Sequence, residues 1–181
     1  MAPPSKLAHI VLQTNRIGDM QDWYCKVLSA RVIHDGRPFI SFISYDEEHH
    51  RIAFLDPGPL SEREPGAGSA AAAGREAGLH HVAFTFASMG DLLDNYMRLQ
   101  AMGIAPFWCV NHGPTTSMYY RDPDRNQVEL QIDNFPTVEE GRAYMETPAF
   151  HKNPVGVAFD PEALNARFRA GASLEELTLI D

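Results

Sequence analysis

A repeated order of expected secondary structure most constrains how this 181-residue chain can fold. Residues 6–56 predict a strand, an amphipathic helix and three further strands, and residues 79–132 predict the same order again. Neither half would bury its sheet alone, so the repeat predicts duplicated modules that depend on each other. We therefore expect an α+β fold in which two βαβββ modules form a cupped mixed sheet.

Two segments lie outside the repeat. Residues 57–78 are rich in Pro, Gly, Ala, Ser and Glu, and this composition predicts a linker loop. Residues 133–181 predict a C-terminal helical extension, because Asp160 and Pro161 are a strong helix start and residues 137–145 have a helical pattern. We expect this extension to pack on the modules or on a partner subunit.

The composition excludes several classes of partner. Fifteen Lys and Arg residues against 24 Asp and Glu residues give a formal net charge of −9, which disfavours nucleic acid and anionic membranes. The sequence has only Cys25 and Cys109, too few for a disulfide framework. It has neither a leader-like apolar segment nor an apolar run long enough to cross a bilayer. We expect a cytoplasmic protein.

Three side chains form a candidate metal site. His9 and His81 both occupy the third position of their repeats, so duplication would direct them toward one concavity. Glu129 lies between apolar neighbours in a half-buried strand, where a carboxylate needs a partner or a metal. Two imidazoles and one carboxylate would hold Fe(II) or Mn(II) on one face and leave positions open for substrate and oxygen.

Each residue also has a simpler interpretation. A single strand histidine is more often a hydrogen-bonded core or surface residue than a ligand, and Glu129 could be a solvated carboxylate on an edge strand. The occurrence of two histidines at equivalent repeat positions favours the metal site.

These modules and ligand positions resemble the vicinal oxygen chelate superfamily over residues 6–132. This superfamily includes glyoxalase I, bleomycin- and fosfomycin-resistance proteins, and type I extradiol ring-cleavage dioxygenases. The chain is similar to its small members with a single pair of modules.

Three segments resemble the extradiol dioxygenases in particular. They are Glu48 to Phe54, Asn111 to Gly113 and Tyr119 to Glu129. The resemblance implies that His50 is an acid–base group, that His112 hydrogen-bonds substrate or oxygen, and that Tyr119 contacts a substrate hydroxyl. Arg125 stands where this family usually has glycine.

The resemblance implies a non-haem Fe(II) extradiol dioxygenase that cleaves a catechol-type ring with both atoms of O2. A glyoxalase-like lyase or isomerase is an alternative, but it predicts a fourth ligand where this chain has Ala53. A metal-free binding protein for a drug or aromatic metabolite is another. We expect a small-molecule substrate and a homo-oligomer, with no nucleic-acid or membrane partner.

Overall fold

A computed structural model describes residues 1–61 and 78–180 and divides into two compact units. The first unit holds residues 1–61 together with the short turn Asp122–Arg125, and the second holds the remaining described residues. In the first unit, the Tyr24 hydroxyl donates to Asp122 over 3.1 Å, and Arg16 forms an ion pair with Asp124. None of the described helices is both long and apolar enough to cross a membrane.

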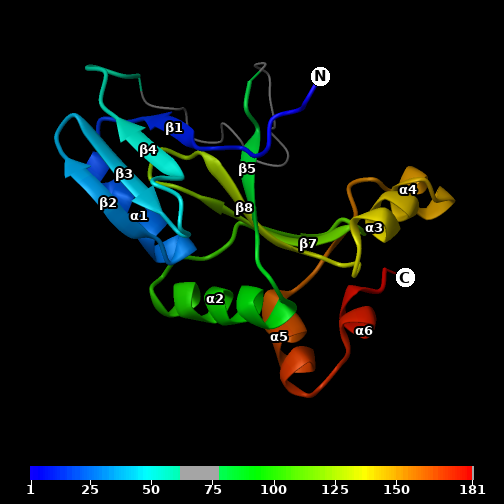
Figure 1. Cartoon of the computed structure of the whole chain (residues 1–181). Coiled ribbons are helices and arrows are strands. Elements are labelled where there is room, and N and C mark those ends of the chain that lie inside the picture. The colour runs from blue at the N-terminus through cyan, green and yellow to red at the C-terminus, as the bar shows by residue number, and fades with distance from the viewer. Residues whose placement is uncertain (62–77, 181) are drawn as a thin grey trace. The chain divides into compact units, whose positions relative to one another are not determined.

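The first unit is a four-stranded mixed sheet with one helix (Figure 1). Its strand order is β1-β4-β3-β2, in which only the β1–β4 pair is parallel. The elements are β1 (Ile10–Gln13), α1 (Ile17–Leu28), β2 (Arg31–Gly36), β3 (Ile40–Ser44) and β4 (Ile52–Leu55).

Helix α1 forms because its apolar residues recur at helical spacing. Met20, Tyr24 and Val27 are buried, and the Tyr24 ring packs on Phe54 of β4 with 5.5 Å between centroids. The helix ends at Ser29, whose φ of 51° is left-handed. This burial covers one face of the sheet and leaves the other free to carry polar side chains.

The second unit repeats this order and adds one strand. Its sheet runs β5-β8-β7-β6-β9, and only the β5–β8 pair is parallel. Ser88 caps α2 by accepting a hydrogen bond from the Asp91 amide. The elements of the repeat are β5 (His81–Thr85), α2 (Met89–Ala101), β6 (Trp108–Asn111), β7 (Thr115–Arg121) and β8 (Gln127–Asp133).

Strand register makes the two units equivalent residue by residue. Ile10 pairs with Ile52 in the first unit, and Val82 pairs with Val128 in the second. His9 and His81 each directly precede these pairs, and Ala53 and Glu129 each directly follow them. The predicted α+β fold with duplicated βαβββ order is therefore confirmed.

The C-terminal extension belongs to the second unit and contains a strand as well as the expected helices. Its elements are α3 (Val138–Met145), α4 (Pro148–Lys152), β9 (Val157–Ala158), α5 (Pro161–Arg169) and α6 (Leu174–Thr178). The helices agree with the expected helical extension, and the strand is an addition to it. The β-branched Val157 follows Gly156, and Val157 and Ala158 form β9 against the open edge of β6.

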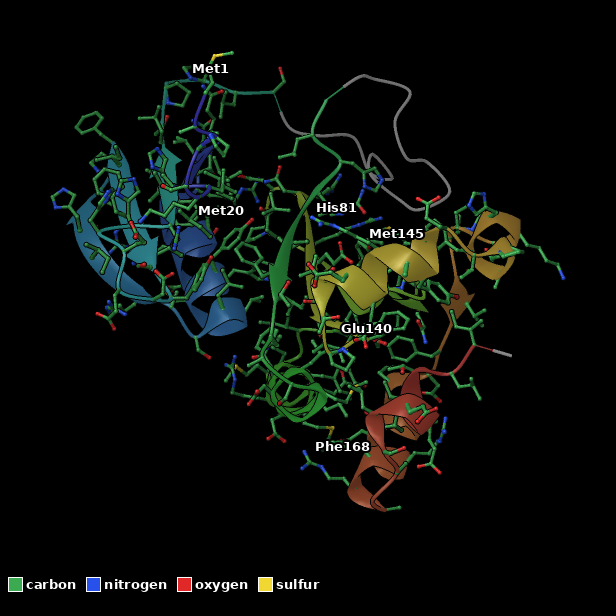
Figure 2. The ribbon with its side chains drawn as sticks, turned by 45° about the vertical axis from the view of Figure 1, so that its right-hand side comes forward. Met1, Met20, His81, Glu140, Met145 and Phe168 are labelled. Carbon is green, nitrogen blue, oxygen red and sulfur yellow. The ribbon has the colours of Figure 1, made fainter. Side chains whose placement is uncertain are left out.

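The extension is fastened to α2 by packing and by a hydrogen bond. Phe168 of α5, labelled in Figure 2, lies against Gly90, where a Cβ would be 3.2 Å from its ring. The Tyr96 hydroxyl donates to Glu162 over 2.8 Å. Of the linker predicted over residues 57–78, residues 62–77 lie outside the described part of the chain, and the predicted domain boundaries stay a prediction.

Candidate functional site

A buried carboxylate paired with an imidazole is the centre of the candidate site. Glu129 lies in β8 between Val128 and Leu130, with only 5% of its side chain exposed. His81 is the first residue of β5 (Figure 2), and its Nε2 lies 2.9 Å from Oε2 of Glu129. The parallel register of β5 and β8 brings these two side chains together.

Hydrogen bonds keep the buried Glu129 carboxylate ionised. Burial alone raises the pKa of a carboxyl group, but hydrogen bonds with His81, Ser117 and Tyr119 outweigh it and hold the pKa of Glu129 below its usual value. The second unit therefore carries a negative charge at a fixed position that is largely shielded from solvent.

Tyr119 lies directly beside Glu129. The two residues pair across β7 and β8, and the Tyr119 ring stacks on Trp108 with 4.8 Å between centroids and 27° between planes. Burial, and then the negative charge of Glu129, raise the pKa of Tyr119 far above its ordinary value. Tyr119 therefore keeps its proton and can act as a hydrogen-bond donor.

His112 extends this arrangement by one residue. Its Nε2 lies 2.9 Å from the Tyr119 hydroxyl, and its Nδ1 lies 2.6 Å from the carbonyl oxygen of Val155. The second unit thus holds a continuous polar row, His81–Glu129–Tyr119–His112. It unites four of the six residues selected from the sequence.

The other two candidates lie together in the first unit. His9 directly precedes β1, and its ring centroid is 4.5 Å from that of His50. His50 stacks on Phe42 of β3 at 4.7 Å, and its Nδ1 lies 2.6 Å from Nδ1 of His49. Partial burial, and then the neighbouring His9 and His49, lower the pKa of His50.

An ionic clasp holds the loop that carries His50. Asp46 accepts from Arg51 and from the Glu48 amide, and the Arg51 guanidinium also donates to the carbonyl oxygens of Leu7 and Ala8. The clasp therefore ties the His50 loop to the segment that leads to His9.

Sequence reasoning missed two neighbours of this row. Ser117 is fully buried and hydrogen-bonds Glu129, and strand alternation from Tyr119 could have identified it. Trp108 stacks on Tyr119 because it pairs with it across β6 and β7.

The donor atoms of the second unit fit a metal ion. His81 and Glu129 supply a nitrogen and an oxygen 2.9 Å apart, close to the roughly 3 Å between adjacent ligands that each lie about 2.1 Å from an octahedral ion. An imidazole and a carboxylate suit iron or manganese. Within residues 1–61 and 78–180, no three His, Cys, Asp or Glu side chains form a cluster arranged to hold an ion.

Comparison with protein families gives a clear result. The model of the glyoxalase/bleomycin resistance protein/dioxygenase superfamily matches residues 6–130, well over half of the chain. The chain belongs to this superfamily. The match covers the duplicated modules and ends before the C-terminal extension.

Two curated relatives match the whole chain. It is 49% identical to biphenyl-2,3-diol 1,2-dioxygenase 2 of Rhodococcus globerulus, over 98% of this chain and 89% of that protein. It is 46% identical to biphenyl-2,3-diol 1,2-dioxygenase 3 of the same organism, over 98% and 90%. These relatives are extradiol dioxygenases, and such enzymes of this superfamily are metalloenzymes.

Solved structures of the superfamily agree at the level of the fold. A lactoylglutathione lyase from Agrobacterium tumefaciens superposes with a TM-score of 0.52 at 18% identity, covering 72% of this chain and 96% of its own. The fosfomycin resistance protein FosX from Listeria monocytogenes gives 0.53 at 20%, with coverages of 77% and 99%. A superfamily domain from Frankia sp. EAN1pec gives 0.55 at 22%, with coverages of 72% and 99%.

Proposed function

We propose that this protein is a metal-dependent extradiol dioxygenase that cleaves a catechol-type ring and incorporates both atoms of O2. The polar row His81–Glu129–Tyr119–His112 carries this proposal. It joins a half-site for a metal to a protonated phenol and an imidazole, which are groups that can bind and protonate a dihydroxylated ring.

The substrate class follows from the relatives. Both curated relatives are named for biphenyl-2,3-diol, a catechol that carries an aryl substituent. At 49% and 46% identity over 98% of the chain, an aryl-substituted or bicyclic catechol is the substrate we propose. Trp108, half-buried beside Tyr119, is an aromatic surface that suits such a ring.

The metal in this proposal is Fe(II), with Mn(II) as the alternative. His81 and Glu129 would supply two ligands, and His9 the third. We include His9 because strand register makes it the counterpart of His81: each directly precedes an equivalent parallel pair. Bound there, the ion would acidify the catechol hydroxyls and supply redox exchange with O2.

The remaining residues handle protons and orientation. Tyr119 donates a hydrogen bond to a substrate oxygen, because the raised pKa keeps its hydroxyl protonated. His112 exchanges a proton at Nε2, the nitrogen that lies 2.9 Å from the Tyr119 hydroxyl. His50 receives the second catechol proton, and its contact with His9 supports that role.

A glyoxalase-like lyase or isomerase is less well supported. That reaction predicts a carboxylate at the first-unit position equivalent to Glu129. The register assigns this position to Ala53, which has no donor atom.

Oxygen consumption tests the proposal. The protein is loaded anaerobically with Fe(II), mixed with catechol, a methylcatechol and biphenyl-2,3-diol, and then exposed to air. We expect O2 uptake together with a new visible absorbance, strongest with the aryl-substituted ring. A metal-loaded protein that consumes no O2 with any catechol would contradict the proposal and favour a binding role.

A further inference from the structure

The C-terminal extension touches the candidate site through one backbone atom. The carbonyl oxygen of Val155 lies 2.6 Å from Nδ1 of His112. From the geometry we infer that the extension is a working part of the active site, because Val155 fixes the tautomer and orientation of His112. This inference rests on the proposed function, in which His112 exchanges a proton.

The direction of this hydrogen bond follows from its acceptor. A carbonyl oxygen can only accept, so Nδ1 of His112 must carry a hydrogen. In the neutral ring, Nε2 is then unprotonated and can only accept a hydrogen bond, and it lies 2.9 Å from the Tyr119 hydroxyl. Any proton that His112 gains or loses is therefore exchanged at Nε2, toward the polar row.

The turn that presents the Val155 carbonyl is tightly built. Gly156 has a φ of 93°, and the Asn153 side chain binds it twice, donating to its carbonyl over 2.8 Å and accepting from its amide over 3.1 Å. A Cβ at Gly156 would overlap the Asn111 carbonyl oxygen. Only glycine lets the extension approach His112 so closely.

The strand after this turn fixes its position along β6. Val157 pairs with Asn111, and the Phe159 amide donates to the Cys109 carbonyl over 3.2 Å. From farther along the extension, the Thr178 carbonyl accepts from the Asn111 side chain over 2.8 Å. The residue directly before His112 is therefore held by two separate parts of the extension.

The comparisons agree with a role specific to the dioxygenases. The superfamily model ends at residue 130, before the extension begins. The alignments with the two biphenyl-2,3-diol 1,2-dioxygenases cover 179 and 180 of the 181 residues, so both include it.

Nuclear magnetic resonance of the imidazole nitrogens tests the inference directly. In metal-free protein above about pH 8, where ordinary imidazoles are neutral, long-range ¹⁵N–¹H correlation identifies the protonated nitrogen. The His112 signals are assigned by their loss in His112→Gln. We expect protonation at Nδ1, opposite to the preference of free histidine, and protonation at Nε2 would overturn the inference.

Two variants and one control connect the tautomer to turnover. In Gly156→Ala and Asn153→Ala, we expect a mixed tautomer and a kcat lower by about 10- to 100-fold, with KM nearly unchanged. Gly171→Ala is the matched control, because Gly171 has a similar φ of 91° but no neighbour within 4 Å of an added Cβ.

The results separate the two proposals. A changed tautomer with unchanged kcat in both variants would overturn the positioning role. If the wild-type protein has no ring-cleavage activity, the proposed function fails, while the tautomer still decides whether Val155 orients His112.

Discussion

The two units share one scaffold but carry different side chains at equivalent positions. Both have a parallel first–last strand pair and the same strand order, and a histidine directly precedes Ile10 of the Ile10–Ile52 pair and Val82 of the Val82–Val128 pair. On the partner strand, the residue after Ile52 in the first unit is Ala53, with a methyl group, and the residue after Val128 in the second unit is Glu129, with a carboxylate. The first unit has an exposed outer strand, β2, whereas the extension pairs with β6 in the second.

The difference teaches how a duplicated fold becomes an asymmetric site. In the proposed site, two histidines and one carboxylate would supply three protein ligands, so an ion held by them would keep positions open for substrate and O2. The second unit also has strand β9, which pairs with β6, and the Val155 carbonyl oxygen, which lies 2.6 Å from Nδ1 of His112.

Replacing Glu129 with alanine, the residue at the equivalent position of the first unit, should remove this asymmetry completely. We expect Glu129→Ala to lose bound iron and to reduce ring cleavage to background, because a proposed ligand and the buried carboxylate that pairs with His81 are gone. Metal analysis and O2 uptake measure both effects. Glu146→Ala removes an exposed carboxylate from the extension and should retain both properties; iron at wild-type levels in Glu129→Ala would contradict the ligand role.

His112→Phe should separate chemistry from metal binding. We expect kcat to fall by about 10²- to 10⁴-fold, the usual contribution of an acid–base group, while iron content stays near that of the wild type. His151→Phe is the control, because His151 is an exposed histidine of the C-terminal extension. Loss of iron in His112→Phe would instead make His112 a ligand.

His50→Phe tests the acid–base role of the first unit. The ring can still stack on Phe42, so the fold should hold, and we expect iron to be retained while kcat falls by about 10- to 100-fold. His34→Phe, in the exposed strand β2, should leave turnover unchanged. Normal activity in His50→Phe would remove this residue from the mechanism.

Asp46 should give the smallest effect, and one with a defined pH dependence. The hydrogen bond from Arg51 lowers the pKa of Asp46 to about 2. Its stabilising contribution is thus complete above the ordinary aspartate pKa of about 4 and declines only as the pH falls toward 2. Asp46→Asn should lower the urea midpoint at neutral pH, with a smaller difference at about pH 3 and a kcat reduced only a few-fold. An equal deficit at both pH values would contradict the clasp.

Local patterns were sufficient to predict most of the fold. Alternation and helical spacing identified both βαβββ orders. Arg125, which stands where the family usually has glycine, has a positive φ of 65°. These features depend on neighbours a few residues apart, which a sequence displays directly.

The contacts of the extension could not be predicted in the same way. Val155 contacts His112 through its backbone carbonyl oxygen, 43 residues away in the sequence. Every residue has such an oxygen, so no pattern of side chains predicts which one makes this contact. Strand β9 has only two residues, too few for any alternation to be visible. The ligand role of His9 still rests on the repeat and on strand register.

The iron content of His9→Ala is therefore the most direct test of the central claim, that histidines from both repeats serve one ion. After anaerobic loading with Fe(II) and removal of excess metal, we expect about one iron per wild-type chain and far less in His9→Ala, with the exposed His151→Ala close to the wild type. A His9→Ala protein that retains wild-type iron and cleaves biphenyl-2,3-diol at the wild-type rate would contradict the account.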